Sequence, residues 1–249
     1  MGLIIPIGLL VAWEAGARAG MLPAYLVAPS ATLATLFQMA LVTGELWRHV
    51  ADSLFRAFGG FFLGTLFGVA MGSLAGVSRT VDTFYDPLIS LTAPMPKVVI
   101  LPILMVWLGL GDASKIATIM ISVFYPTFIN AYYGAKSVNN IYVWVARSMG
   151  AGPVRVFFRV VFPAALPHIF AGARIGLALS FIVMFVAEMV ASNSGLGSLI
   201  LRAEDFHRFD LMFAAVIVIG IVGFASDRVL LAVRARLLAG QLLTAARTA

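Results

Sequence analysis

The sequence predicts an all-α, polytopic membrane protein with about six transmembrane helices, built as one domain over residues 1–249. Hydrophobic residues make up 61% of the chain and charged residues only 11%, whereas a soluble domain carries about a quarter charged residues. The mean hydropathy is +1.01. Long uncharged stretches recur, and several reach the roughly 20 residues that a spanning helix needs. A chain so poor in polar groups cannot cover a globular surface in water, so the bilayer is its solvent.

Composition also excludes several classes of chemistry. The chain has no cysteine, so disulfides, thiolate catalysis and cysteine metal sites are absent. His49, His168 and His207 are scattered, which predicts no metal site. No glycine-rich phosphate loop is followed by Lys-Ser or Lys-Thr, so the chain does not supply an ATPase of its own. We therefore predict no catalytic residues, no bound cofactor and no nucleic-acid partner.

The first two elements precede the main apolar stretches. Residues 2–19 predict a short first span, in which Glu14 and Arg18 stand four apart and can pair on one helical face. This segment has no basic start and no clear cleavage site, so we expect a retained helix instead of a removed signal peptide. Residues 30–49 follow a Pro-Ser helix start and are amphipathic, which predicts a helix at the membrane surface or packed on the bundle.

Five further windows are apolar enough to span the membrane: 57–78, 87–111, 116–135, 166–191 and 209–226. The first of them carries a stripe of small residues, which predicts close packing between helices (Gly59, Gly60, Gly64, Gly68 and Gly72). The second contains three prolines that are expected to kink it (Pro94, Pro96 and Pro102).

Lysine and arginine orient these spans, because cytoplasmic loops collect them. The loop after residue 135 holds four cations and no acidic residue (Lys136, Arg147, Arg155 and Arg159). The C-terminal tail holds four arginines against Asp227 alone. Both segments are predicted to be cytoplasmic, whereas the loop after residue 191 mixes both signs and is predicted to lie outside. Six spans then place both termini in the cytoplasm.

The loop at residues 139–165 carries the clearest local pattern. Asn139 or Asn140 can cap a short helix that runs to Met149. The run Gly150-Ala151-Gly152-Pro153 then ends it and starts a second helix. That helix places Val156, Phe157, Val160 and Val161 on one face and Arg155 and Arg159 on another, and Pro163 and Pro167 are expected to end it. The resulting helix–turn–helix offers a rigid, partly apolar docking surface for a soluble partner.

This loop resembles the EAA loop of bacterial ABC-importer permeases, in which Glu-Ala-Ala precedes a glycine and an I-x-L-P motif follows. Here the glycine is Gly150, and Val160-Val161-Phe162-Pro163 stands at the I-x-L-P position. Trp144-Val145-Ala146 occupies the triplet, so Trp144 replaces the family glutamate and removes the ion pair that it would make. The resemblance assigns ATPase coupling to residues of this loop (Trp144, Val145, Ala146, Arg147, Ser148, Met149, Gly150, Ala151, Gly152, Pro153, Arg155, Val160 and Pro163).

Segments elsewhere are similar to the nitrate/sulfonate/taurine-type branch of the same permeases: 53–64, 85–116, 162–190 and 195–200. The resemblance implies a methionine-importer-type permease fold in the bacterial inner membrane. It also implies a second permease copy, two ATPase subunits that use ATP and Mg, and an external substrate-binding protein. The implied cargo is a small anion such as a sulfonate, taurine or nitrate, and relatives that carry thiamine-precursor pyrimidines look alike in this subunit.

Four polar residues at membrane depth, or at its edge, are candidates for the substrate path: Lys97, Asn130, Glu188 and Asn193. Each has a plainer alternative. Lys97 and Arg174 can extend toward the headgroups, and the asparagines can hydrogen-bond between helices. Glu188 can line the path, hold two helices together, or meet water or a nearby arginine close to the outer surface.

Two other functions remain open from the sequence. An ion-coupled secondary transporter would use Glu188 as its proton-coupled group, but it leaves the loop at 139–165 without a role. A non-transporting membrane anchor would use that loop to recruit a partner, but it leaves the proline-rich span and Glu188 unexplained.

Overall fold

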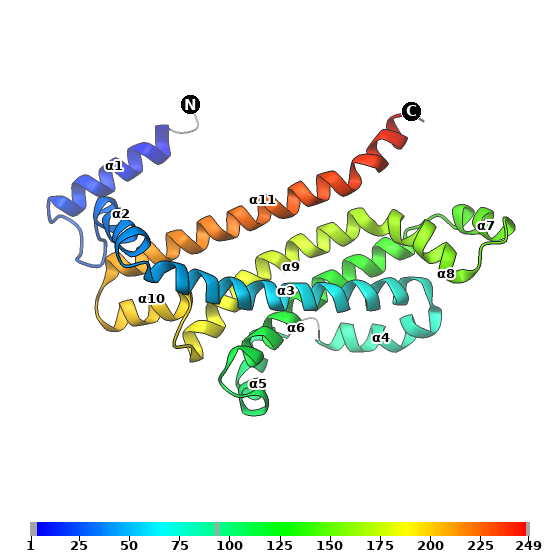
Figure 1. Ribbon diagram of the computed structural model, residues 1–249, viewed down its shortest axis with the longest axis horizontal. Helices are drawn as coiled ribbons and strands as arrows, with labels where there is room; N and C mark the ends of the chain where they lie inside the picture. The colour runs from blue at the N-terminus through cyan, green and yellow to red at the C-terminus, as the bar shows by residue number, and fades with distance from the viewer. Residues whose placement is uncertain (1–3, 93–94, 248–249) are drawn as a thin grey trace. The chain divides into compact units, whose positions relative to one another are not determined.

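The computed structural model describes residues 4–92 and 95–247, and every regular element in these ranges is a helix, as Figure 1 shows. The elements in chain order are α1 (Ile4–Arg18), α2 (Pro29–Phe37), η1 (Gln38–Val42), α3 (Glu45–Val77), α4 (Arg79–Thr92), η2 (Lys97–Ile100), α5 (Leu101–Leu108), α6 (Asp112–Lys136), α7 (Asn140–Ser148), α8 (Pro153–Val156), η3 (Phe157–Val161), α9 (Phe162–Ala191), α10 (Leu196–Asp205) and α11 (Phe209–Arg247). The all-α prediction is confirmed.

Within the described residues, four helical stretches are long and apolar enough to cross a membrane: Glu45–Val77, Asp112–Lys136, Pro153–Ala191 and Phe209–Leu238. They contain the predicted windows 57–78, 116–135, 166–191 and 209–226 almost entirely, and each helix extends beyond its window. The other two predicted spans correspond to shorter helices: α1 in the first window, and the end of α4 with η2 and α5 in the window 87–111.

The span predicted over residues 87–111 is interrupted near its prolines, in line with the expected kink. The helix α4 ends at Thr92, the 3-10 turn η2 begins at Lys97, and α5 occupies only Leu101–Leu108. Pro96 has an extended backbone (φ −64°, ψ 110°) and no N–H, so no α-helical hydrogen bond can pass through it. Pro102 fits the first turn of α5, where a missing N–H costs nothing. Pro94 lies outside the described residues.

The first predicted span forms α1, a helix of 15 residues, and the predicted pair within it is present. Arg18 Nε lies 2.5 Å from Glu14 Oε1. The same carboxylate accepts hydrogen bonds from the backbone N–H (3.0 Å) and the hydroxyl (2.6 Å) of Ser30, so it joins α1 to the start of α2. The helix expected over 30–49 ends at Val42, since Gly44 adopts a left-handed conformation (φ +70°) and α3 then begins at Glu45.

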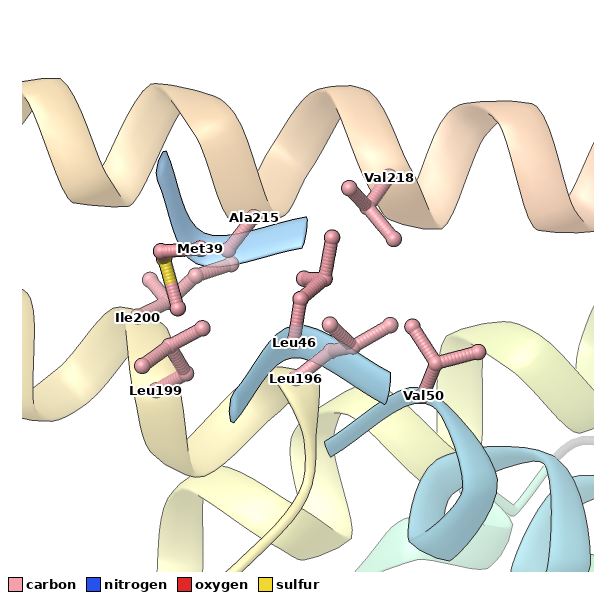
Figure 2. Packing of buried hydrophobic residues seen from close by; sticks show 8 residues of the cluster. All are labelled: Met39, Leu46, Val50, Leu196, Leu199, Ile200, Ala215 and Val218. Carbon is pink, nitrogen blue, oxygen red and sulfur yellow. The ribbon is translucent and has the colours of Figure 1, made fainter. Parts of the chain in front are cut away.

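The chain divides into two compact units, Met1–Phe55 with Met184–Val222 and Arg56–Val183 with Gly223–Ala249. The first unit has an apolar core to which η1, α3, α10 and α11 contribute, and Figure 2 shows its side chains converging between these helices. Its buried members are Met39, Leu46, Val50, Leu196, Leu199, Ile200, Ala215 and Val218. The short helix α10 buries its apolar face here, so this core fixes the position of α10 within the unit.

The second unit contains the predicted glycine contact, which is confirmed. A Cβ added to Gly64, Gly68 or Gly76 would lie 2.6 Å from the carbonyl oxygen of Met120, 2.8 Å from that of Phe124 and 2.7 Å from that of Tyr132, respectively. Gly60 and Gly72 face the carbonyls of Ile116 and Phe128 in the same way. The paired residues are four apart on both helices, so α3 and α6 run parallel in a fixed register with their backbones in direct contact.

Candidate functional site

The helix α7 begins with a side-chain cap. The Asn139 side-chain carbonyl accepts a hydrogen bond of 2.9 Å from the backbone N–H of Ile141, which satisfies one of the free donors at the helix start. The helix then runs over Asn140–Ser148, so the predicted cap and helix are confirmed.

Replacing Asn139 with alanine is expected to destabilise the first turn of α7 by about 1 kcal/mol, because the Ile141 N–H loses its acceptor. Hydrogen exchange of the Ile141 amide, measured by mass spectrometry on the protein in nanodiscs, checks this. The exchange rate should rise in the alanine variant. Asn139→Asp keeps an acceptor at the same position and should exchange at the wild-type rate. Equal rates in all three proteins would contradict the role of the cap.

The turn after α7 is a complete Schellman motif. The N–H of Ala151 bonds to the carbonyl of Ala146 (3.0 Å) and the N–H of Gly150 to the carbonyl of Arg147 (2.9 Å). Gly150 has φ +79°, a left-handed conformation that residues with a Cβ avoid. Gly152 precedes Pro153, which occupies the first turn of α8. The predicted turn is therefore confirmed in both of its glycines and its proline.

The second predicted helix does not end at Pro163 or Pro167, and this part of the prediction is wrong. The segments α8, η3 and α9 form one continuous helix over Pro153–Ala191. In η3 the helix widens to π geometry, with the N–H of Phe162 bonded to the carbonyl of Phe157 five residues earlier. A π turn next to Pro163 relieves the clash between the proline ring and the carbonyl four residues before it, so the helix continues.

The loop packs on its own apolar face. Val156 and Val161 are buried with Ala135, and Phe157 and Val160 pack against them, as predicted for these four side chains of the second helix. Arg155 and Arg159 are exposed, also as predicted. The interior of the loop is thus closed by its own residues and by the end of α6, which makes the turn a rigid unit.

The outer side of the loop leaves large apolar side chains uncovered. Trp144 is 65% exposed, Met149 80%, Val154 68% and Phe158 62%. We call these four residues the apolar corner. A groove of about 320 Å³ adjoins it, lined among others by Lys136, Trp144, Arg147 and Phe157. Exposed apolar side chains of this size, set among cations, are typical of a protein–protein contact.

The predicted coupling residues lie together in this loop. Trp144 to Ser148 lie on α7, Met149 to Gly152 in the turn, Pro153 and Arg155 on α8, Val160 in η3 and Pro163 at the start of α9. Ala146 faces inward and packs against the Val156 cluster, so it supports the turn. The coupling role of this set stays a prediction.

Of the substrate-path candidates, Glu188 has the most complete set of partners. It is fully buried near the end of α9. The Ser53 hydroxyl lies 2.9 Å from its Oε1 and 2.8 Å from its Oε2, and the N–H of Gly197 donates to Oε2 at 2.9 Å. Asn193, in the loop before α10, is exposed.

Lys97 and Asn130 belong to the other unit, and both side chains donate hydrogen bonds to backbone carbonyls. The Lys97 ammonium group donates to the carbonyls of Thr92 and Met95, the latter at 2.7 Å, and lies 4.0 Å from the centre of the Tyr125 ring. It thus caps the C-terminal end of α4, where the helix dipole favours a cation. Asn130 donates to the carbonyl of Pro126 at 2.8 Å on its own helix.

Three polar contacts escaped the sequence patterns. Arg56, which is buried, bonds Asp112 at 2.6 Å and joins α3 to the first turn of α6. Lys115 is buried as well and donates to the carbonyls of Leu110 and Gly111. The contact of Ser53 with Glu188 was also missed, because nothing near Ser53 in the sequence marks it as a partner of Glu188. Their one shared signal is a polar residue in an otherwise apolar helix.

Arg174, expected to extend toward the headgroups, is exposed and pairs with α11. Its Nε lies 2.7 Å from Asp227 Oδ1, and its Nη2 lies 3.0 Å from Asp227 Oδ2. This bidentate contact joins α9 to α11 within the second unit.

Comparison with known proteins agrees with this geometry. The taurine transport system permease protein TauC of Escherichia coli (strain K12) is 36% identical over 219 residues, covering 86% of this chain and 80% of its own length. The permease SsuC of Bacillus subtilis (strain 168), named for aliphatic sulfonate transport, is 31% identical over 91% of this chain and 82% of its own length. A chain of the MetNI methionine ABC transporter in an inward-facing conformation superposes with a TM-score of 0.55 at 23% identity, covering 79% of this chain and 97% of that one.

The solved structure confirms the predicted methionine-importer-type fold, and the identity to the two relatives extends over most of the chain. Residues 64–238 match the family described as the binding-protein-dependent transport system inner membrane component, a stretch that includes the whole loop at 139–163. The chain belongs to this family of inner-membrane permeases.

Proposed function

We propose that this chain is the permease subunit of an ABC importer, and that it moves a small sulfonate-type anion inward by alternating access. The observation that carries the proposal is the apolar corner, a preformed helix–turn–helix that leaves Trp144 and Met149 uncovered. A transporter coupled to an ion gradient requires no soluble partner, so this surface would have no role in it. A permease driven by a soluble ATPase needs a surface to which the ATPase binds and through which its movement is transmitted.

In this mechanism two copies of the permease surround a path, and each loop at 139–163 docks on one ATPase subunit. ATP and Mg belong to the ATPase, and an external binding protein delivers the solute. ATP binding draws the two ATPase subunits together, and the docked loops follow them. Because packed helices have discrete arrangements, such a displacement switches the permease between outward- and inward-open states. Both termini and the loop then lie in the cytoplasm, in agreement with the charge distribution.

The names of the relatives support the substrate class. TauC is named for taurine and SsuC for aliphatic sulfonates, and these solutes share one anionic sulfonate group. We extend that class to this chain and assign the choice between individual sulfonates to the external binding protein.

Mass spectrometry of the proteins that co-purify with the chain from its native membrane tests the proposal. We expect an ATPase in a one-to-one ratio with the permease. The double variant Trp144→Asp, Met149→Asp should lose it, because two carboxylates would then have to be buried in the contact. Met21→Asp is the matched control, since Met21 is 81% exposed and lies outside the loop.

Recovery of the wild-type chain without any ATPase, under gentle extraction, would contradict the importer assignment. Retention of the ATPase by the double variant would move the docking surface away from the apolar corner. Uptake of labelled taurine by the purified complex in liposomes, with ATP inside, then tests the substrate class.

A further inference from the structure

The carboxylate of Glu188 lies at the N-terminus of α10, within the first unit. The cap residue of this helix is Gly195, which has no side chain to satisfy the free N–H groups of the first turn. Three consecutive N–H groups are satisfied by side chains from other helices instead. Gly195 donates to His49 Nδ1 (3.1 Å), Leu196 to Ser53 Oγ (2.8 Å) and Gly197 to Glu188 Oε2 (2.9 Å).

The contacts of Ser53 and Glu188 form one connected network. The Ser53 hydroxyl accepts from Leu196 and, having one proton, donates it to the Glu188 carboxylate. The carboxylate receives both the Ser53 proton and the Gly197 N–H, and it also lies in the positive field of the helix N-terminus. A buried carboxylate needs such compensation, because burial without partners costs several kcal/mol. The network therefore explains why an acidic residue is present so late in α9.

The two glycines on either side of Leu196 fit the carboxylate closely. Gly195 has φ +109°, and the nearest neighbours of an added Cβ would be the three carboxylate atoms of Glu188. A Cβ on Gly197 would lie 2.6 Å from the carbonyl oxygen of Phe185 and 2.8 Å from Glu188 Cβ. With Glu188 fully buried, no surface of the carboxylate is left for a solute to reach.

We propose that Glu188 is a positioning residue: together with Ser53 it clamps the N-terminus of α10 to α3 and α9, and it does not contact the transported solute. The clamp holds the N-terminal end of α10. The apolar face of this helix begins there with Leu196, which is buried in the core of the first unit. The spacing between Glu188 and Gly195-Leu196-Gly197 then has a structural role. The two glycines leave room for the carboxylate, and the carboxylate caps the helix.

Amide hydrogen exchange in nanodiscs tests the clamp without reference to transport. In Ser53→Ala the amide of Leu196 loses a neutral acceptor and should exchange about two- to tenfold faster. In Glu188→Gln the amide of Gly197 loses its charged acceptor and should exchange about tenfold to a hundredfold faster. Glu204→Gln is the matched control, because Glu204 is an exposed carboxylate on the same helix. Its Leu196 and Gly197 amides should exchange as in the wild type.

The transport arm rests on the proposed function and separates positioning from solute contact. A positioning role predicts that Glu188→Gln and Ser53→Ala both lower the maximal rate of ATP-driven uptake, while KM for the solute is unchanged. A raised KM in Glu188→Gln, with unchanged exchange at Leu196 and Gly197, would overturn the proposal and place Glu188 on the substrate path.

The two arms can fail separately. Absence of ATP-driven uptake by the wild-type protein would count against the proposed function, and the exchange result would still decide the clamp. If Glu188→Gln cannot be purified as a folded protein, Ser53→Ala carries the test, since it removes only a hydroxyl. Wild-type exchange rates in Ser53→Ala would then overturn the proposal.

Discussion

Replacing Gly150 with valine is expected to lower ATP-coupled transport by about five- to thirtyfold, while the chain still inserts into the membrane. The backbone of Gly150 is left-handed (φ +79°), and this conformation costs a residue with a Cβ roughly 1–2 kcal/mol, which corresponds to that factor. Valine is branched at Cβ and fits the left-handed region worse than other residues. The turn would open, and the apolar corner would lose its fixed geometry.

Controls at the same position isolate the backbone effect. An added Cβ at Gly150 has no neighbour within 4 Å, so valine meets no steric obstacle there. Gly150→Asn adds a side chain of comparable size, but asparagine tolerates the left-handed conformation, so this variant should retain most of the transport. The measurement is ATP-driven uptake in liposomes, with insertion checked by membrane fractionation. Equal uptake by the valine and asparagine variants would contradict the argument.

Valine at Gly68 or Gly72 is expected to have the largest effect on folding. Both glycines bring the backbone of α3 against α6, and a Cβ at Gly68 would lie 2.8 Å from the carbonyl oxygen of Phe124. A backbone carbonyl cannot rotate away as a side chain can, so the two helices must separate. Overpacking of this kind costs about 1–3 kcal/mol at each position, and separation also removes the contacts of the neighbouring glycines.

Thermal unfolding of the purified protein, followed by tryptophan fluorescence and size-exclusion chromatography, measures this effect. Both valine variants should unfold at a lower temperature and elute partly as aggregate. Gly59→Ala provides the control in the same helix, because its Cβ would meet only the Ile116 side chain, at an ordinary 3.4 Å. Wild-type stability in Gly68→Val would show that α3 and α6 are not held together by this contact.

The features that the sequence predicted well depend on residues that strongly favour one backbone conformation or one position in a helix. Asn139, Gly150 and Pro153 each have a strong local preference, and the cap, the turn and the helix start all form where they predict. The glycine stripe predicted close packing for a similar reason, since few structures other than a helix contact use small residues at that spacing.

The features that sequence missed depend on context. Proline interrupts the helix at Pro96 but is accommodated within a helix at Pro163, because a π turn precedes Pro163 and widens the helix beside it. Nothing local to the proline distinguishes the two cases. Glu188 is a similar case, since its partner Ser53 is 135 residues away and only the fold brings them together. Local propensity predicts helix ends better than it predicts which polar groups meet.

The uninterrupted helix from Pro153 onward has a mechanical consequence. No loop separates the turn at Gly150 to Pro153 from the membrane-spanning part of α9 within the second unit, so a force applied at Pro153 acts on a rod instead of a tether. Torque about the rod axis reaches the span directly, and it passes through η3, where the hydrogen bonding departs from the α-helical pattern. Any rotation of the apolar corner is therefore expected to appear as twist in the span.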